Sequence, residues 1–119
     1  MVAELTDRSM AAVPRPLLDA IVRRFDPVEV ILFGSRARGD AGPDSDWDLL
    51  VVLDDDVPVE DLRLRAAYEA VAGTRIAADV VPCRKAWFDR KRDVVNSLPW
   101  IAATQGIVVH ERARRPQAT

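Results

Sequence analysis

Residues 33–52 read FGSRARGDAGPDSDWDLLVV, and this segment connects two predicted strands. An apolar run over 28–33 ends at Gly34, which is typical of a buried strand followed at once by a turn. The β-forming residues 47–53 predict the second strand. Between the two strands we expect a short helical turn over 36–38 and then a loop over 40–45.

Helices and strands alternate on both sides of this segment. Apolar residues recur at helical spacing from Pro14 to Phe25, and Asp26-Pro27 closes that helix. The later patterns predict a helix from Pro58 to Val71, a strand over 75–82, helices over 85–96 and 99–105, and a last strand over 107–110. This order favours an α/β (α+β) fold with helices packed on one face of a small sheet, which leaves the other face open for a site.

Length and composition limit the possible functions. The 119 residues are 49% hydrophobic and 30% charged, with a formal net charge of -2, which fits one globular domain. That charge gives no general attraction to nucleic acid or a membrane surface, so any phosphate binding must be local. Cys83 is the single cysteine, which excludes an internal disulfide and favours a cytoplasmic location. No apolar run approaches the ~20 residues of a membrane span.

Gly34 and Ser35 lie where the first strand of the segment ends and the helical turn begins. The first amides of a helix have no partner within it, so they can bind the oxygens of a phosphate group. Glycine allows the backbone to approach such a group closely, and the serine hydroxyl adds one donor. A Gly-Ser pair by itself is more often an ordinary turn, and the neighbouring residues must decide between the two interpretations.

Asp46 and Asp48 are separated by one residue at the start of the second strand. Residues two apart in a strand point to the same face, so both carboxylates are expected on one side of the sheet, roughly 7 Å apart. Two carboxylates on one face favour a divalent cation such as Mg²⁺, which takes oxygen ligands from protein and phosphate. The alternative is a solvated strand face. The apolar run 49–52 that follows weakens this alternative, because it is expected to lie inside the sheet.

A third acid, Asp79, lies in the apolar sequence IAADVV at 76–81. Burying a lone carboxylate costs several kcal/mol, so this side chain needs a partner or water. If its strand lies beside that of Asp46 and Asp48, the three carboxylates form a cluster able to hold two metal ions and to position a hydroxyl for attack on phosphorus. The alternative is an edge-strand residue that faces water.

Gly34-Ser35, ten intervening residues and Asp46-x-Asp48 resemble the signature of the DNA polymerase β-like nucleotidyltransferases, specifically the minimal nucleotidyltransferase family. The resemblance spans nearly the whole chain and implies that family's fold, with a small mixed sheet. It also implies transfer of AMP from ATP with two Mg²⁺ ions. By the resemblance, Gly34 and Ser35 hold the β- and γ-phosphates. Asp46 and Asp48 bind Mg²⁺, Asp79 shares the catalytic metal and helps to deprotonate the acceptor, and Arg36 steadies the triphosphate.

The resemblance also implies a protein partner. Larger transferases add a domain that grips the acceptor, so we expect a second protein to supply it here. In the family this partner is a HEPN-type RNase toxin, and the transferase silences it as a type VII-like antitoxin by adenylylating a hydroxyl, expected to be a tyrosine. Two alternatives stay open: a non-catalytic antitoxin that masks the toxin by binding, and a transferase that acts on a small molecule. We expect neither membrane nor direct nucleic-acid contact.

The domain is expected over 14–111, between a flexible segment at 1–13 and a flexible tail at 112–119. Asp54, Asp55 and Asp56 are interpreted as a solvated cap of the next helix rather than as a second metal site. Tyr68 is expected at an interior or boundary position of its helix, not as a site of self-modification.

Overall fold

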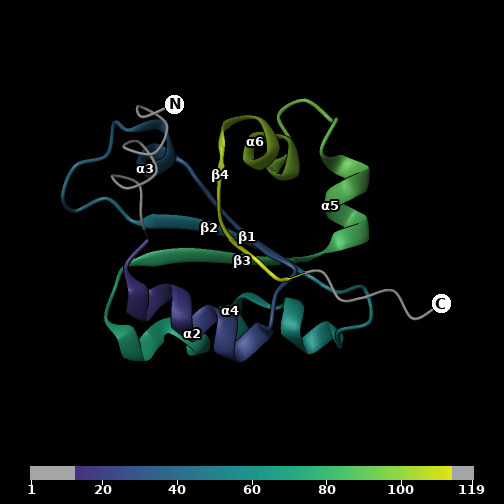
Figure 1. Cartoon of the computed structure of the whole chain (residues 1–119), viewed down its shortest axis with the longest axis horizontal. Coiled ribbons are helices and arrows are strands. Elements are labelled where there is room, and N and C mark those ends of the chain that lie inside the picture. Colours follow the sequence, from purple (N-terminus) through teal and green to yellow (C-terminus); the bar gives the residue numbers. More distant parts are fainter. Residues whose placement is uncertain (1–12, 114–119) are drawn as a thin grey trace.

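The computed structural model describes residues 13–113, which form one sheet with helices on both of its faces (Figure 1). The predicted segments 1–13 and 112–119 therefore lie almost entirely outside the described residues. Among the described helices, none has the length and apolar character needed to cross a membrane. In chain order the elements are α2 (Arg15–Phe25), β1 (Glu29–Phe33), α3 (Ser35–Arg38), β2 (Trp47–Leu53), η1 (Val59–Leu62), α4 (Leu64–Val71), η2 (Ala72–Thr74), β3 (Ala78–Arg84), α5 (Lys85–Lys91), α6 (Leu98–Gln105) and β4 (Ile107–Glu111).

The sheet has four strands in the order β3-β2-β1-β4. Strand β1 runs antiparallel to β2 and β4, whereas β2 and β3 are parallel. The parallel pair requires a crossover, and α4 with its flanking 3-10 turns supplies it. The mixed α/β class and the small mixed sheet expected from the sequence are therefore confirmed.

Helices cover both faces of the sheet, so the prediction of helices on one face is wrong. Along β2, Leu49 and Val51 belong to the core under α2 and α4, whereas Leu50 and Val52 belong to a second core under α5 and α6. In Figure 1, α2 and α4 lie below the strands, and α5 and α6 lie above them. Residues 49–52 are almost completely buried because they supply apolar side chains to both layers.

Two predicted helices end earlier or break. The helix expected over 85–96 ends at Lys91, because two β-branched valines follow it and Asn96 adopts a left-handed φ of 72°. Ser97 then donates its hydroxyl to the Lys91 carbonyl (2.8 Å) and caps α6 by accepting from the Trp100 amide. The helix expected from Pro58 is interrupted at Arg63, whose backbone is extended between η1 and α4.

Tyr68 is an exposed residue of α4, which corrects its predicted interior or boundary position. Its exposed fraction is 70%, and that of Leu64 one turn earlier is 66%. The buried residues of this helix are Ala67 and Val71, which face the sheet. Because α4 is only two turns long and buries small side chains, the larger Tyr68 is left on the outer face.

Candidate active site

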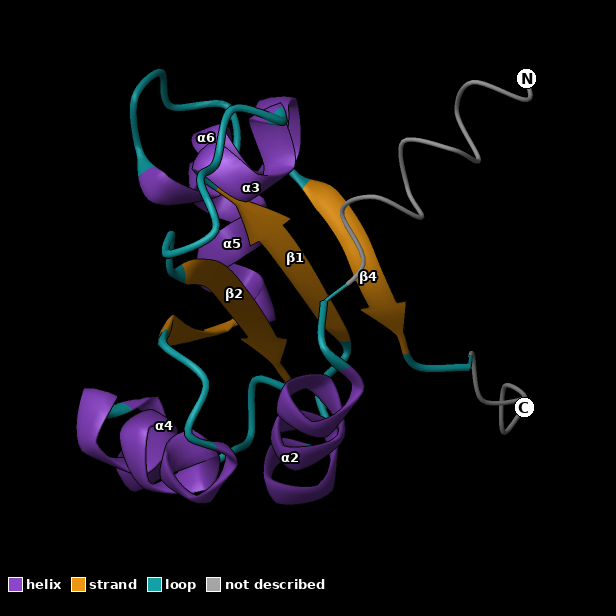
Figure 2. Cartoon of the chain, turned by 90° about the vertical axis from the view of Figure 1, so that its left-hand side faces the viewer, coloured by secondary structure: helices purple, strands orange, loops and turns teal. Residues whose placement is uncertain are grey.

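Gly34 lies between β1 and α3. Figure 2 shows the chain turning from the end of β1 into α3, near the start of β2. Its φ of 77° and ψ of −158° fall in a region that is essentially restricted to glycine. A Cβ atom at this position would overlap Oδ2 of Asp48. Glycine is therefore required for two reasons: it adopts this backbone conformation, and it allows the Asp48 carboxylate to approach closely. The corner therefore brings the backbone at the start of α3 directly against the carboxylate of Asp48.

Asp48 and Asp79 are direct neighbours on parallel strands. They are paired in the β2–β3 register, a position in which adjacent strands lie about 4.8 Å apart. Both residues alternate with side chains of the α2 and α4 core, so both carboxylates face the side of α5 and α6. The core under α5 and α6 begins at Leu50, which is the next residue of β2 on the same face as Asp48. The two acids thus occupy the end of this face, before the packed apolar side chains.

Asp46 completes a group of three carboxylates whose charges act on each other. Partial burial raises the pKa of Asp48 above its ordinary value. The charge of Asp79 and a hydrogen bond with it raise the pKa further, as does the charge of Asp46, while Arg38 opposes the rise. Asp46 and Asp79 are exposed, so solvent and ligands can reach the group. A divalent cation would relieve the repulsion that raises this pKa, and the donor set therefore suits a hard cation.

The structure thus brings Gly34, Asp46, Asp48 and Asp79 together, with Ser35 as the first residue of α3. In residues 13–113, no group of three or more acidic, histidine or cysteine side chains could hold a metal ion as the side chains stand. Carboxylates that repel each other are not expected to come within coordination distance of one point without a cation. Substrate phosphate also normally supplies part of the coordination of Mg²⁺. The metal and nucleotide roles of these residues stay predictions.

Two arginines of α3 have different surroundings. Arg36, predicted to steady the triphosphate, donates hydrogen bonds to backbone carbonyls of the loop before β2. Arg38, which the sequence analysis did not single out, is the one whose charge acts on Asp48. Its position three residues after Ser35, on the same short helix, was the available signal.

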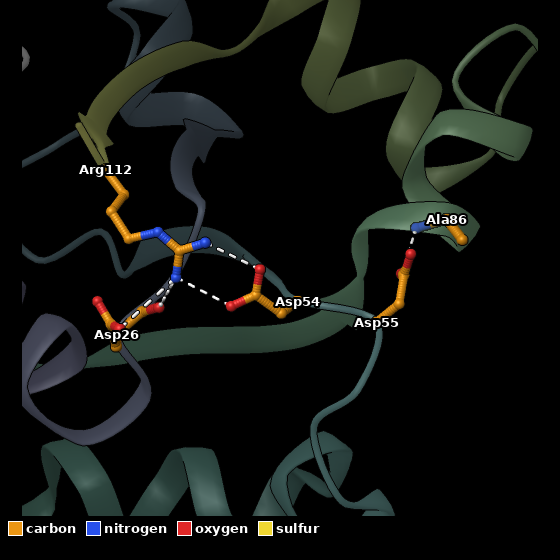
Figure 3. A network of polar contacts seen from close by, with 5 residues as sticks. All are labelled: Asp26, Asp54, Asp55, Ala86 and Arg112. Carbon is orange, nitrogen blue, oxygen red and sulfur yellow. Dashed lines mark hydrogen bonds and ion pairs between the residues drawn. The ribbon is translucent and has the colours of Figure 1, made fainter. Parts of the chain in front are cut away.

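The acids at the other end of β2 have protein partners (Figure 3). Asp54 accepts two hydrogen bonds from the guanidinium of Arg112, at 2.8 and 2.9 Å. Asp55 accepts from the amide of Ala86 at 2.8 Å and so caps α5, not the helix that follows it in sequence. The prediction that these aspartates cap the next helix is wrong, because Asp55 caps α5 and Asp54 bonds Arg112.

The sequence pattern of the nucleotidyltransferase domain family matches residues 15–101, which is most of the chain. The chain belongs to the nucleotidyltransferase domain family. This nucleotidyltransferase shares its fold with a Sulfolobus solfataricus protein assigned to the nucleotidyltransferases, at 21% identity and a TM-score of 0.56, covering 94% of this chain and 89% of that one. It is similarly related to a chain of a toxin–antitoxin structure with AMP-PNP, at 20% identity and a TM-score of 0.57, covering 84% of this chain and 75% of that one. Comparison with curated proteins finds no significant match.

Proposed function

We propose that this nucleotidyltransferase transfers AMP from ATP to a hydroxyl group of a HEPN-type RNase toxin and thereby acts as its antitoxin. The observation that carries the proposal is the pairing of Asp48 with Asp79 beside Gly34. This arrangement puts carboxylates for a cation next to backbone amides suited to phosphate oxygens. The similarity to a toxin–antitoxin structure that contains an ATP analogue supports both the nucleotide and the partner.

Each residue of the site has a separate part in the proposed transfer. Asp46 and Asp48 would hold Mg²⁺, with Asp79 sharing the ion nearest to the acceptor. Bound magnesium supplies charge neutralisation on the phosphate oxygens. The amides after Gly34 and the Ser35 hydroxyl would orient the β- and γ-phosphates. Asp79, exposed at the strand end, would accept the proton as the hydroxyl oxygen bonds to the α-phosphorus and the bond to pyrophosphate breaks.

A protein acceptor fits the position of the acids. Asp46 and Asp79 are exposed at the end of the sheet, where a side chain of another protein can reach them. A tyrosine hydroxyl suits this geometry because its ring extends the reacting oxygen away from the backbone of the partner. Adding AMP to a residue beside a basic RNA-binding cleft would place a bulky anion there and repel RNA. This consequence explains how the modification would silence an RNase.

The test is transfer to the product of the neighbouring gene, which the proposal requires to be a HEPN-type protein. The purified pair is incubated with ATP and Mg²⁺, and intact masses are recorded for the wild type and for Asp48→Asn. We expect the toxin to gain the mass of one or more AMP groups with the wild type only. Unmodified toxin, together with full protection of cells by Asp46→Asn/Asp48→Asn at equal abundance, would instead establish inhibition by binding.

A further inference from the structure

The side chain of Arg36 contacts the residues on both sides of Asp46. Its Nε donates to the carbonyl oxygen of Ser45 at 3.0 Å, and its Nη2 donates to the same oxygen at 2.7 Å. The guanidinium carbon lies 4.1 Å from the centroid of the Trp47 ring. A third hydrogen bond reaches the Pro43 carbonyl at 3.3 Å. A single planar group therefore holds the backbone before Asp46 and the side chain after it.

Asp46 lies outside regular secondary structure, so contacts of its neighbours must fix its position. It is the last residue of a loop without regular structure over 40–46, directly before β2, which begins at Trp47. The loop has a local contact of its own, in which the Gly42 amide donates to the Ser45 hydroxyl at 3.0 Å. The Trp47 amide donates to the Ala77 carbonyl, which fixes the first residue of the strand. Asp46 lies between these anchored residues and is exposed, and the charge of nearby Asp48 repels it.

We infer that Arg36 is a positioning residue, which fixes the backbone before Asp46 and the side chain of Trp47 after it, and so keeps the Asp46 carboxylate near Asp48. The inference rests on the proposed nucleotidyl transfer and concerns the same site. It assigns the guanidinium to the protein rather than to the triphosphate, because its Nε and one Nη already bond carbonyl oxygens and its face lies on an indole ring.

Arg38 provides the contrast on the same helix. It is exposed, and its Nε donates to the side chain of Asp40 at 3.3 Å. Exposed ion pairs of this kind are weak and exchange readily. Its charge also acts on Asp48. Arg38 is therefore the arginine of α3 whose charge is available to an incoming phosphate group.

A lysine at position 36 separates the two roles. Lysine keeps the positive charge that a phosphate ligand needs, but its ammonium group lacks the planar fork that bonds the carbonyls and stacks on the ring at the same time. We therefore compare the wild type with Arg36→Lys, and use Arg23→Ala as the control. Arg23 is an exposed arginine of α2, on the opposite face of the sheet from the acids. Trp47→Phe is a second variant that keeps an aromatic ring in the packing.

Two measurements are made on each protein. Amide hydrogen exchange of the loop 40–46 is followed without nucleotide or metal, and adenylyl transfer to the toxin is measured against ATP and Mg²⁺ concentration. For Arg36→Lys we expect loop exchange at least about tenfold faster and kcat about 10- to 100-fold lower, since small displacements of reacting groups cost that much. We also expect a higher Mg²⁺ requirement and a KM for ATP within about twofold of the wild type. Trp47→Phe should change the same quantities in the same direction by less.

The results separate this inference from the proposed function. Unchanged loop exchange and kcat in Arg36→Lys would overturn the positioning role, as would a raised KM for ATP with kcat unchanged. If Arg36→Lys does not fold, Trp47→Phe decides, and wild-type exchange in that variant would overturn the inference. Full activity of Asp48→Asn would overturn the proposed function itself, whatever the exchange of the loop.

Discussion

The two ends of β2 both carry aspartates, but the aspartates have opposite surroundings. After the strand, Asp54 is bonded to Arg112 and Asp55 to the amide of Ala86 (Figure 3). At the start of the strand, Asp48 is paired with Asp79 on β3, and the charges of Asp79 and Asp46 both act on it. The same residue type is therefore neutralised at one end and left in mutual repulsion at the other.

This difference shows that the partners of a carboxylate, more than its sequence pattern, indicate its role. A carboxylate bonded by an arginine or a helix amide contributes to stability. A carboxylate whose pKa is raised by neighbouring carboxylates costs stability unless a cation joins them, and such groups are typical of functional sites. Substitutions at the two ends should accordingly have opposite effects on activity and stability.

Exchanging Asp48 for asparagine is expected to have the largest effect. The change removes a charged ligand of the proposed Mg²⁺ site and should reduce adenylyl transfer about 1,000-fold, equivalent to about 4 kcal/mol of transition-state stabilisation. Asp55→Asn is the matched control, because it makes the same chemical change at the other end and keeps an oxygen that can accept from Ala86. Equal loss of activity in both variants would contradict the functional difference between the two ends.

Gly34→Ala tests the corner beside Asp48. The new methyl group would strain a backbone with a φ of 77° and displace the Asp48 carboxylate. We expect a loss of about 1–3 kcal/mol in the free energy of unfolding, together with reduced transfer. Gly42→Ala provides the control, since no atom lies within 4 Å of a Cβ there. Urea unfolding measures both, and an unchanged midpoint for Gly34→Ala would show that the corner tolerates a side chain.

Arg112→Ala tests the neutralised end. The variant loses both hydrogen bonds to Asp54 and one to the Asp26 carbonyl. Because Asp54 is 44% exposed, we expect a loss of about 1 kcal/mol in the free energy of unfolding. Arg65→Ala removes the fully surface pair with Glu69 and should cost less than about 0.5 kcal/mol. Transfer activity should survive in both variants. Its loss in Arg112→Ala would show that contacts at one end of β2 affect the activity of the acids at the other end.

The smallest expected effect is the pH dependence of stability at Asp48. Its pKa in the folded chain is raised above the ordinary value of 3.8, mainly by burial and then by Asp79. Between these two values the folded chain holds a proton that the unfolded chain has released, so the contribution of Asp48 to stability falls as the pH rises through this range. Asp48→Asn should therefore be slightly more stable than the wild type at neutral pH, and the advantage should shrink toward pH 3.8. Urea unfolding from about pH 7 to about pH 4 measures it.

The sequence predicted the positions of the strands, and thereby the face on which Asp48 lies, because these depend on local rules. The alternation that buries residues 49–52 also determines on which face Asp48 lies. The sequence left open whether the strand of Asp79 lies beside that of Asp48, and the structure pairs the two residues in the parallel β2–β3 register. The extent of β2 itself, 47–53, was predicted from β-forming residues alone.

Other features depend on tertiary contacts that no sequence period reveals. The path of α5 and α6 over the second face is determined by packing of Phe88 and Ala102. The surroundings of Arg36 depend on the path of an irregular loop, which determines where the Ser45 carbonyl points. A motif can indicate that an arginine belongs to a site, but only its contacts show which group it binds.

The parallel pairing of β2 with β3 has a consequence for how the protein matures. Asp46 and Asp48 leave the ribosome well before Asp79, and they meet it only after the crossover helix has folded and β3 has docked beside β2. A nascent chain in which β3 has not docked would therefore hold two of the three acids and be inactive. Under the proposed chemistry, catalytic competence would report complete folding, and an unfinished antitoxin would neither consume ATP nor modify its toxin.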